Sequence, residues 1–85
     1  MNHLSDQNMN KYYIGIDTGS VSINSVVINS DRQIVHESPY LRHFGKIEGA
    51  VHDLLINEYK LFGEDNIMAV AFTGNHGEHL VLIAR

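Results

Sequence analysis

The residues of this chain best suited to chemistry are Asp17, Thr18, Gly19 and Ser20, which follow a short apolar run. A carboxylate after a strand, followed at once by a glycine and hydroxyl side chains, fits two unrelated kinds of chemistry. One is the binding of a metal-bound polyphosphate, in which backbone amides of a tight turn approach the phosphate oxygens. The other is acid–base catalysis by two such carboxylates that meet across a dimer axis. Asp-Thr-Gly is also an ordinary turn sequence.

For phosphate binding, the turn has what a magnesium polyphosphate needs. Gly19 lets the backbone approach the oxygens closely, and three hydroxyls lie beside it, those of Thr18, Ser20 and Ser22. Magnesium keeps most of its waters, so the single carboxylate of Asp17 is enough to hold it through them. The two common nucleotide motifs, GxxxxGK[ST] and GxGxxG, are both missing.

Three strands are expected to position the turn. Residues 11–16 are β-branched and aromatic and end at Asp17, residues 21–29 are β-branched, and residues 33–38 return as a third antiparallel strand. The alternation of the second strand slips near Ser25, which suggests a bulge or burial on both faces.

Residues 46–62 change to helical spacing, and Gly63 is a natural C-terminal cap. Residues 66–74 are apolar on both faces, as expected of a buried parallel strand. A helix between two strands is a crossover, and it makes the sheet mixed. The helix stripe comprises Ile47, Ala50, Val51, Leu54, Leu55, Glu58, Tyr59, Leu61 and Phe62, of which only Glu58 is polar.

The pattern therefore predicts an α/β fold with a mixed sheet: a strand, a hairpin, a further strand, a crossover helix and a buried parallel strand. We expect residues 1–11 to be a disordered polar N-terminus and residues 12–85 to form one small domain. Residues 78–85, EHLVLIAR, are typical of the first turns of another element.

Composition excludes several function classes. The chain has 85 residues, a net charge of -4 and only scattered Lys and Arg, so it has no basic stripe for nucleic acid. It contains no cysteine, which rules out disulfides, thiol nucleophiles and thiolate metal clusters within it. The polar start is no signal peptide, and no apolar run approaches the ~20 residues that cross a bilayer. We expect a soluble, cytoplasmic chain without a membrane partner.

The stretch GIDTGSVS, followed by a hairpin, resembles the first phosphate motif of the superfamily of acetate and sugar kinases, heat-shock chaperone ATPases and actin. Within it, the chain is most similar to the BadF/BadG/BcrA/BcrD-type ATPases, which activate 2-hydroxyacyl-CoA dehydratases and benzoyl-CoA reductases. The resemblance runs from about Tyr12 to Leu80. It includes the turn at 17–20, the approach PYLRHFGKIEGAV and the strand ending Phe72-Thr73-Gly74.

This resemblance implies a ribonuclease-H-like half-lobe that binds ATP or ADP with magnesium. Asp17 would lie at the metal, Gly19 and Ser20 at the phosphates, and Thr73-Gly74 near the same cleft. Implied partners are the nucleotide, a second lobe or second copy of the chain, and a dehydratase or reductase. The expected nucleotide-binding set is Asp17, Thr18, Gly19, Ser20, Ser22, Thr73 and Gly74, with no catalytic residue assigned.

Departures from the family pattern limit the expected activity. Family members commonly read D-x-G-S-T-T-T-K, whereas this chain has Asn24 in place of the lysine, which removes a cation near the phosphates. It lacks the second phosphate motif and the adenosine motif, and without cysteine it cannot bind the family's iron–sulfur cluster. Phosphoryl transfer depends on positioning and charge from several directions, so we expect weak nucleotide binding at most and no useful turnover.

Two other functions stay open. One is a non-enzymatic scaffold or interaction module with a vestigial turn. The other is a homodimeric aspartic protease, which needs one DTGS per chain; residues 71–74 resemble its hydrophobic-hydrophobic-Gly segment, but the 46–62 helix does not fit. A ribonuclease-H-like nuclease would need a second carboxylate where Phe72-Thr73-Gly74 has none.

The histidines and two nearby bases have simpler interpretations. The cluster His76-Gly77-Glu78-His79 is not an HExxH motif and has no evident ligand outside it, and it is expected at the surface. His36, His43 and His52 are isolated, and we interpret them as structural or solvent-facing. Arg42 and Lys46 can reach an anion, yet single bases before a helix are usually solvated.

Overall fold

An antiparallel hairpin forms the centre of the fold in a computed structural model that describes residues 11–74 and 83–84. Strands β1 (Tyr12–Thr18) and β2 (Ser22–Asn29) pair along their whole length, from Tyr12 opposite Asn29 to Thr18 opposite Ile23. The β-branched residues of both strands favour this pleated geometry. The Asp17 turn therefore lies at one end of a long, well-paired ribbon.

The remaining strands extend the hairpin on both sides. Strands β3 (Ile34–Glu37) and β4 (Leu41–Arg42) pair antiparallel with β2. Strand β5 (Ile67–Gly74) pairs parallel with β1, and β6 (Ile83–Ala84) pairs antiparallel with β5. The order along the sheet is β3-β2-β1-β5-β6, with β4 beside β2. The predicted α/β class and mixed sheet are confirmed.

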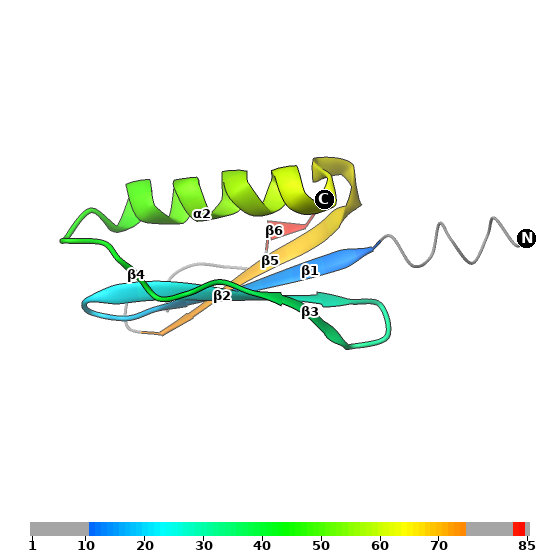
Figure 1. Cartoon of the computed structure of the whole chain (residues 1–85), viewed down its shortest axis with the longest axis horizontal. Helices are drawn as coiled ribbons and strands as arrows, with labels where there is room; N and C mark the ends of the chain where they lie inside the picture. The colour runs from blue at the N-terminus through cyan, green and yellow to red at the C-terminus, as the bar shows by residue number, and fades with distance from the viewer. Residues whose placement is uncertain (1–10, 75–82, 85) are drawn as a thin grey trace, which may run out of the picture.

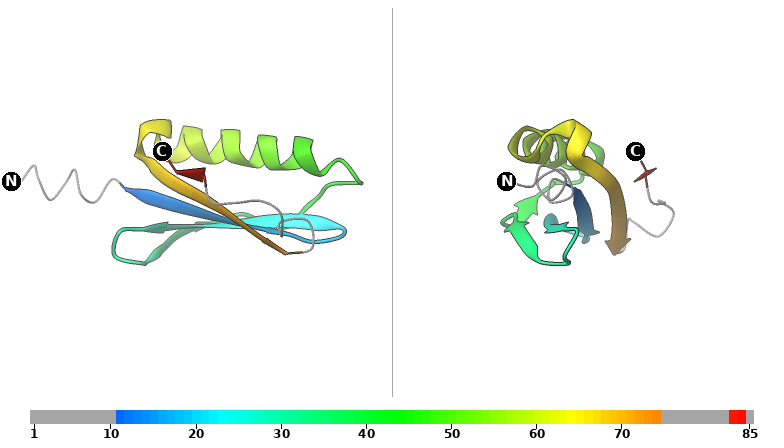
Figure 2. Two further views of the ribbon diagram at one scale, coloured as in Figure 1. Left: turned by 180° about the vertical axis from the view of Figure 1, so that it is seen from behind. Right: turned by 90° about the vertical axis from the view of Figure 1, so that its right-hand side faces the viewer.

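One helix, α2 (Ile47–Phe62), crosses between β4 and β5 and lies over one face of the sheet (Figures 1 and 2). It ends at Gly63, whose φ is 89° and whose N–H donates to the Tyr59 carbonyl at 2.8 Å, so the predicted cap is confirmed. A short 3-10 helix, η1 (Glu64–Asn66), leads into β5.

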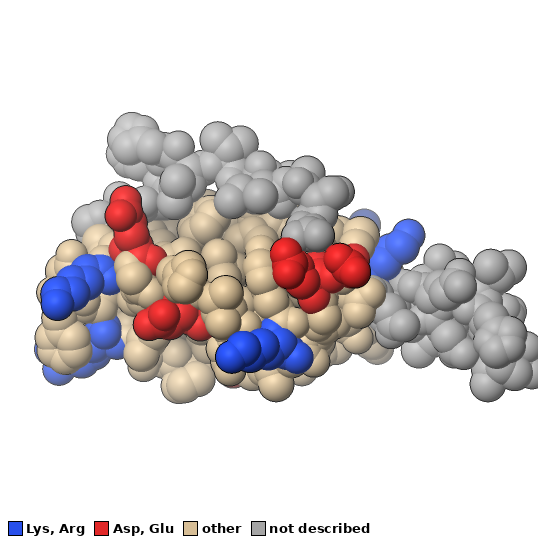
Figure 3. Space-filling model, turned by 90° about the horizontal axis from the view of Figure 1, so that it is seen from above, with Lys and Arg blue, Asp and Glu red and all other residues tan. Residues whose placement is uncertain are grey.

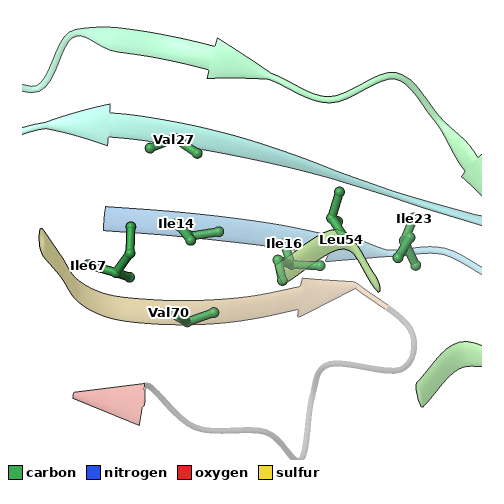
Figure 4. Close-up of a cluster of buried hydrophobic side chains, with 7 residues drawn as sticks. All are labelled: Ile14, Ile16, Ile23, Val27, Leu54, Ile67 and Val70. Carbon is green, nitrogen blue, oxygen red and sulfur yellow. The ribbon is translucent and has the colours of Figure 1, made fainter. Parts of the chain in front are cut away.

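The hydrophobic core lies between this helix and the sheet (Figure 4). Alternate residues of β1 and β2 point toward α2, and β5 adds Ile67 and Val70, which are three positions apart because its pairing with β1 shifts register. The helix contributes Leu54. Around this cluster pack half-buried side chains such as Tyr12 and Phe62, whose ring centroids are 4.7 Å apart. The buried cluster comprises Ile14, Ile16, Ile23, Val27, Leu54, Ile67 and Val70.

The opposite face of the sheet is apolar but has no helix over it in the described part of the chain. A shallow hollow on it is lined by residues that include Tyr13, Gly15, Val26 and Ala71. A Cβ placed on Gly15 would meet no atom within 4 Å. The prediction that β5 is buried on both faces is therefore wrong: the parallel strand is present, but Ala71 on its other face is exposed, and among the described residues a helix covers one side alone.

Strand β2 also differs in detail from the prediction. Its residues alternate regularly, and Ser25 takes an ordinary inward position that is 1% exposed. The pairing irregularity lies later, between Val27 and Ile28, where β2 meets β3. The slip near Ser25 thus marks a buried polar residue and no bulge at that position.

Some expectations fall outside what the structure describes. One is the predicted disorder of residues 1–10. The others concern residues 75–82, which include the His76–His79 cluster. Residues 83–84 do belong to a strand, β6. Within the described segments, no helix has the length and apolar character needed to cross a membrane.

We expect Ile16→Ala to lower the free energy of unfolding by about 2–5 kcal/mol, because it leaves a cavity in the core. Ile16 is 0% exposed. The matched change Ile34→Ala, at an edge-strand residue that is 59% exposed, should cost less than about 1 kcal/mol. Urea unfolding of both variants measures the difference, and equal losses would contradict the assignment of the core.

Candidate functional site

Asp17 lies near the carboxyl end of β1 on the sheet face away from α2. Its cross-strand partners are Asn24 of β2 and Thr73 of β5. Paired residues share a face of a sheet, so these three polar side chains form a row across the central strands. Asp17 is exposed, whereas its neighbours Ile16 and Thr18 are buried on the other face. The row places a carboxylate, an amide and a hydroxyl at the edge where β1 and β5 both end.

Gly74 brings the end of β5 against the Asp17 turn. Its φ is +98°, a conformation that side chains rarely adopt. A Cβ at this position would collide with the Thr18 carbonyl oxygen and lie 2.7 Å from Asp17 Oδ1 and 2.9 Å from the Thr18 nitrogen. Only glycine fits, and the two predicted segments meet in direct backbone contact.

Thr18 supports this contact from the buried side. It is 1% exposed, and its Oγ1 donates to the Thr73 carbonyl at 2.9 Å across 55 residues of sequence. The hydroxyl therefore ties β1 to β5 below the site. Direct contact of Thr18 with a phosphate stays a prediction. In the structure its hydroxyl is buried and stabilises the pairing of β1 with β5.

The turn itself uses part of its donor capacity internally. The Gly19 N–H donates to the Ser22 carbonyl at 2.9 Å, and a Cβ on Gly19 would lie 3.0 Å from that oxygen. Gly19 is thus needed for close approach within the turn. The next two amides, Ser20 and Val21, have no hydrogen-bond partner among the described residues. The exposed Ser20 and half-buried Ser22 side chains add two hydroxyl groups to the turn.

The loop that enters α2 packs against this turn, which the sequence did not predict. The His43 backbone N–H donates to the Val21 carbonyl at 3.1 Å, and its ring Nε2 lies 3.0 Å from the Gly19 carbonyl. His43 is 5% exposed. A small hollow between turn and loop is lined by Ser20, Val21, Arg42, His43, Phe44 and Gly45. Only the tertiary contact identifies His43, because its sequence neighbours give no signal.

Figure 3 shows basic side chains at the end of the molecule where α2 begins, but both signs of charge occur along the helix, with Glu48 in its first turn and Lys60 in its last. Arg42 pairs with Ser22 in the sheet, and its guanidinium carbon lies 5.4 Å from the Phe44 ring centroid. Arg42 and Lys46 line one hollow beside the start of the helix. A cation thus reaches the turn from β4, although Asn24 replaces the lysine that the family pattern would supply.

A second polar cluster lies in the core, away from the turn. Glu58 of α2 is 0% exposed and accepts a hydrogen bond from the Ser25 hydroxyl through Oε2. His36 Nε2 of β3 lies 3.8 Å from the same oxygen. The other oxygen, Oε1, is buried without a partner in the described residues. Glu58 lies at helical spacing within the apolar stripe of 46–62, and this spacing alone predicts that its side chain is buried.

Burial raises the pKa of Glu58 above its ordinary value of 4.5 because the charged form loses hydration. The Ser25 hydrogen bond and the nearby His36 act in the opposite direction and compensate only in part. The carboxyl is enclosed by core side chains and therefore cannot meet a substrate in this arrangement. Its role in the described structure is to join α2 to β2 and β3.

The donor set around Asp17 suits magnesium better than a transition metal. One carboxylate with neighbouring hydroxyl and amide groups matches a hard cation that keeps most of its waters. Among residues 11–74, no three His, Asp or Glu side chains cluster as a metal site. The site therefore fits a cation that arrives with its phosphate ligand.

Comparisons with protein-family models, with curated proteins and with solved structures gave no significant match for this chain. Its function must therefore be inferred from the geometry described above and from the motif resemblance.

We expect Gly74→Ala to lower the free energy of unfolding by about 2 kcal/mol or more, because it combines a strained φ with a backbone collision. Gly49 is the matched control, since a Cβ there meets nothing within 4 Å. Gly49→Ala lies within α2 and should raise stability by up to about 1 kcal/mol. Urea unfolding measures both, and a neutral Gly74→Ala would contradict the close contact with Asp17 and Thr18.

The raised pKa of Glu58 predicts that stability falls as pH rises. The folded chain keeps a proton on Glu58 at pH values where the unfolded chain has released it. This contribution is complete below the ordinary value of 4.5 and is lost as pH rises through the raised folded-state value. Glu58→Gln keeps the shape and removes the charge, so its unfolding midpoint should exceed that of the parent at about pH 7.

The gain of Glu58→Gln should vanish near pH 4, where the parent carboxyl is also neutral. Thermal unfolding across this pH range measures it. Glu48→Gln alters an exposed carboxylate in the first turn of the same helix and should give no gain, because a negative charge is favourable there. A pH-independent difference for Glu58→Gln would contradict the proton linkage.

Proposed function

We propose that this chain is the first phosphate-binding segment of a ribonuclease-H-like ATPase lobe and binds Mg·ADP or Mg·ATP weakly through the turn after β1. Its fuller role would be in an ATPase that activates a CoA-substrate dehydratase or reductase. The proposal of that role rests on the resemblance of GIDTGSVS and the strand ending Phe72-Thr73-Gly74.

The observation that carries the proposal is the contact of Gly74 with Asp17 and Thr18. The two segments are distant in sequence, and the resemblance implies that both lie near one cleft. Their meeting point lies at the carboxyl ends of two parallel strands, where open α/β sheets bind ligands. A backbone with no side chain at Gly74 leaves the Asp17 carboxylate open to a hydrated cation.

The arrangement of charge also supports the proposal. Asp17 would hold magnesium through water, and Ser20 and Ser22 with the Ser20 and Val21 amides would face phosphate oxygens. Arg42 lies beside Ser20 in the hollow between turn and loop and would balance phosphate charge in place of the missing lysine. Guanidinium groups suit this task because their planar donors match phosphate oxygens.

Only one side of a nucleotide site is built from these residues. The sheet face beyond Asp17 is apolar, and among the described residues no element lies over it to enclose a phosphate bound at the turn. In-line phosphoryl transfer requires stabilisation of charge from several directions. We therefore expect binding by this chain without measurable hydrolysis, and completion of the cleft by a second lobe or second copy.

A scaffold or interaction module is the second candidate function. It is favoured by the uncovered apolar face, which has the character of a surface that another element covers. In that case the turn would be an ordinary structural hairpin, and a nucleotide would have no effect on the chain.

We expect Asp17→Asn to weaken Mg·ADP binding by about tenfold or more, equal to about 1.4 kcal/mol. Amide ¹H–¹⁵N spectra of the 85-residue chain, titrated with Mg·ADP to millimolar concentration, measure it through residues 17–22 and 73–74. Asp31→Asn removes the same charge from an exposed residue at the opposite end of the hairpin and should leave binding unchanged. A well-dispersed spectrum that ignores Mg·ADP, or equal effects of both substitutions, would favour the scaffold.

A further inference from the structure

His43 holds the turn between β1 and β2 by two separate groups. Its backbone N–H donates to the Val21 carbonyl at 3.1 Å, and its ring Nε2 contacts the Gly19 carbonyl at 3.0 Å. The ring is also contacted on its other nitrogen, Nδ1, by the Gly45 N–H at 3.0 Å. With 5% of the residue exposed, the ring is enclosed between the turn and its own loop.

These partners determine where the ring proton lies. A backbone N–H can only donate, so Nδ1 must accept from Gly45 and carries no proton. A backbone carbonyl can only accept, so Nε2 must carry the proton and donate it to Gly19. The two bonds therefore fix the orientation of the ring between Gly19 and Gly45.

The Gly19 bond has a consequence for the next amide. In a trans peptide the carbonyl and the following N–H point in opposite directions. When His43 fixes the Gly19 carbonyl toward its ring, it directs the Ser20 N–H away from that ring. Ser20 is exposed, and its N–H is one of the two turn amides with no partner in the described part of the chain.

We infer that His43 is the positioning residue of the phosphate turn: it fixes the Gly19–Ser20 peptide so that the Ser20 amide is presented to an anionic ligand. The ligand role of that amide rests on the phosphate binding proposed above. The turn-fixing role does not, because it follows from the hydrogen bonds of His43 alone.

Two substitutions separate this task from simple packing. In His43→Gln, the side-chain amide nitrogen occupies the place of Nε2 and can donate to Gly19, whereas the acceptor for Gly45 is lost. In His43→Asn, the side-chain oxygen occupies the place of Nδ1 and can accept from Gly45, whereas the donor to Gly19 is lost. If His43 only filled space, His43→Asn and His43→Gln would affect the turn according to side-chain size, and not according to which hydrogen bond each variant retains.

The first measurement is amide hydrogen exchange of the 85-residue chain without ligand. The Gly19 N–H, bonded to the Ser22 carbonyl, reports whether the turn is closed. We expect His43→Asn to speed its exchange about tenfold, the effect of one lost hydrogen bond, and His43→Gln to stay within about threefold of the parent. Exchange of the Ile16 amide in the centre of β1 corrects for changes in overall stability.

The second measurement is a Mg·ADP titration of the same three chains by amide spectra. We expect His43→Asn to weaken binding about tenfold and to reduce the shift of the Ser20 amide, with His43→Gln close to the parent. If the parent ignores Mg·ADP, the phosphate role falls while the exchange data still decide whether His43 fixes the turn. Equal Gly19 exchange in both variants, or faster exchange in His43→Gln than in His43→Asn, would overturn the inference.

Discussion

The parallel pairing of β1 with β5 is the constraint on which the rest of the structure depends. Two parallel strands cannot be joined by a tight turn, so the chain must cross the sheet between them, and α2 makes this crossing. The same pairing brings the carboxyl ends of both strands to one edge. Asp17 and Gly74 therefore meet because of sheet topology, and the glycine is required because no side chain fits between those strand ends.

The buried glutamate gives this arrangement a definite register. Glu58 of α2 bonds to Ser25 of β2 and lies near His36 of β3, so it joins the helix to two strands. A shift of β2 by one residue would turn Ser25 to the open face and leave the carboxyl in an apolar core without its donor. Burial of the charged Glu58 carboxylate costs free energy, so the cluster adds little net stability. Its effect is to disfavour packing arrangements in which Glu58 loses its bond to Ser25.

The sequence was sufficient for the features that depend on local pattern. Strands β1, β2, β3 and β5, the helix over 47–62 and its end at Gly63 follow from β-branched runs, helical spacing and a glycine after the last turn, whereas the two-residue strands β4 and β6 were not predicted. It was insufficient where distant segments meet. His43 has no distinguishing sequence neighbours, and the helical stripe indicates burial of Glu58 without naming its partners, which only the packed structure shows. Likewise the apolar residues of β5 predict burial on both faces. Whether a face is covered depends on whether another helix or strand packs against it.

The loop of His43 also connects the turn to the helix. The Lys46 N–H donates to the His43 carbonyl at 2.7 Å, and the Ala50 N–H donates to the Lys46 carbonyl at 3.1 Å. Turn, histidine and first helical turn thus form one continuous chain of hydrogen bonds. The loop residue His43 therefore couples the position of the Gly19 peptide to the start of the 16-residue helix, so a change at either end of this series alters the hydrogen bonds of the other.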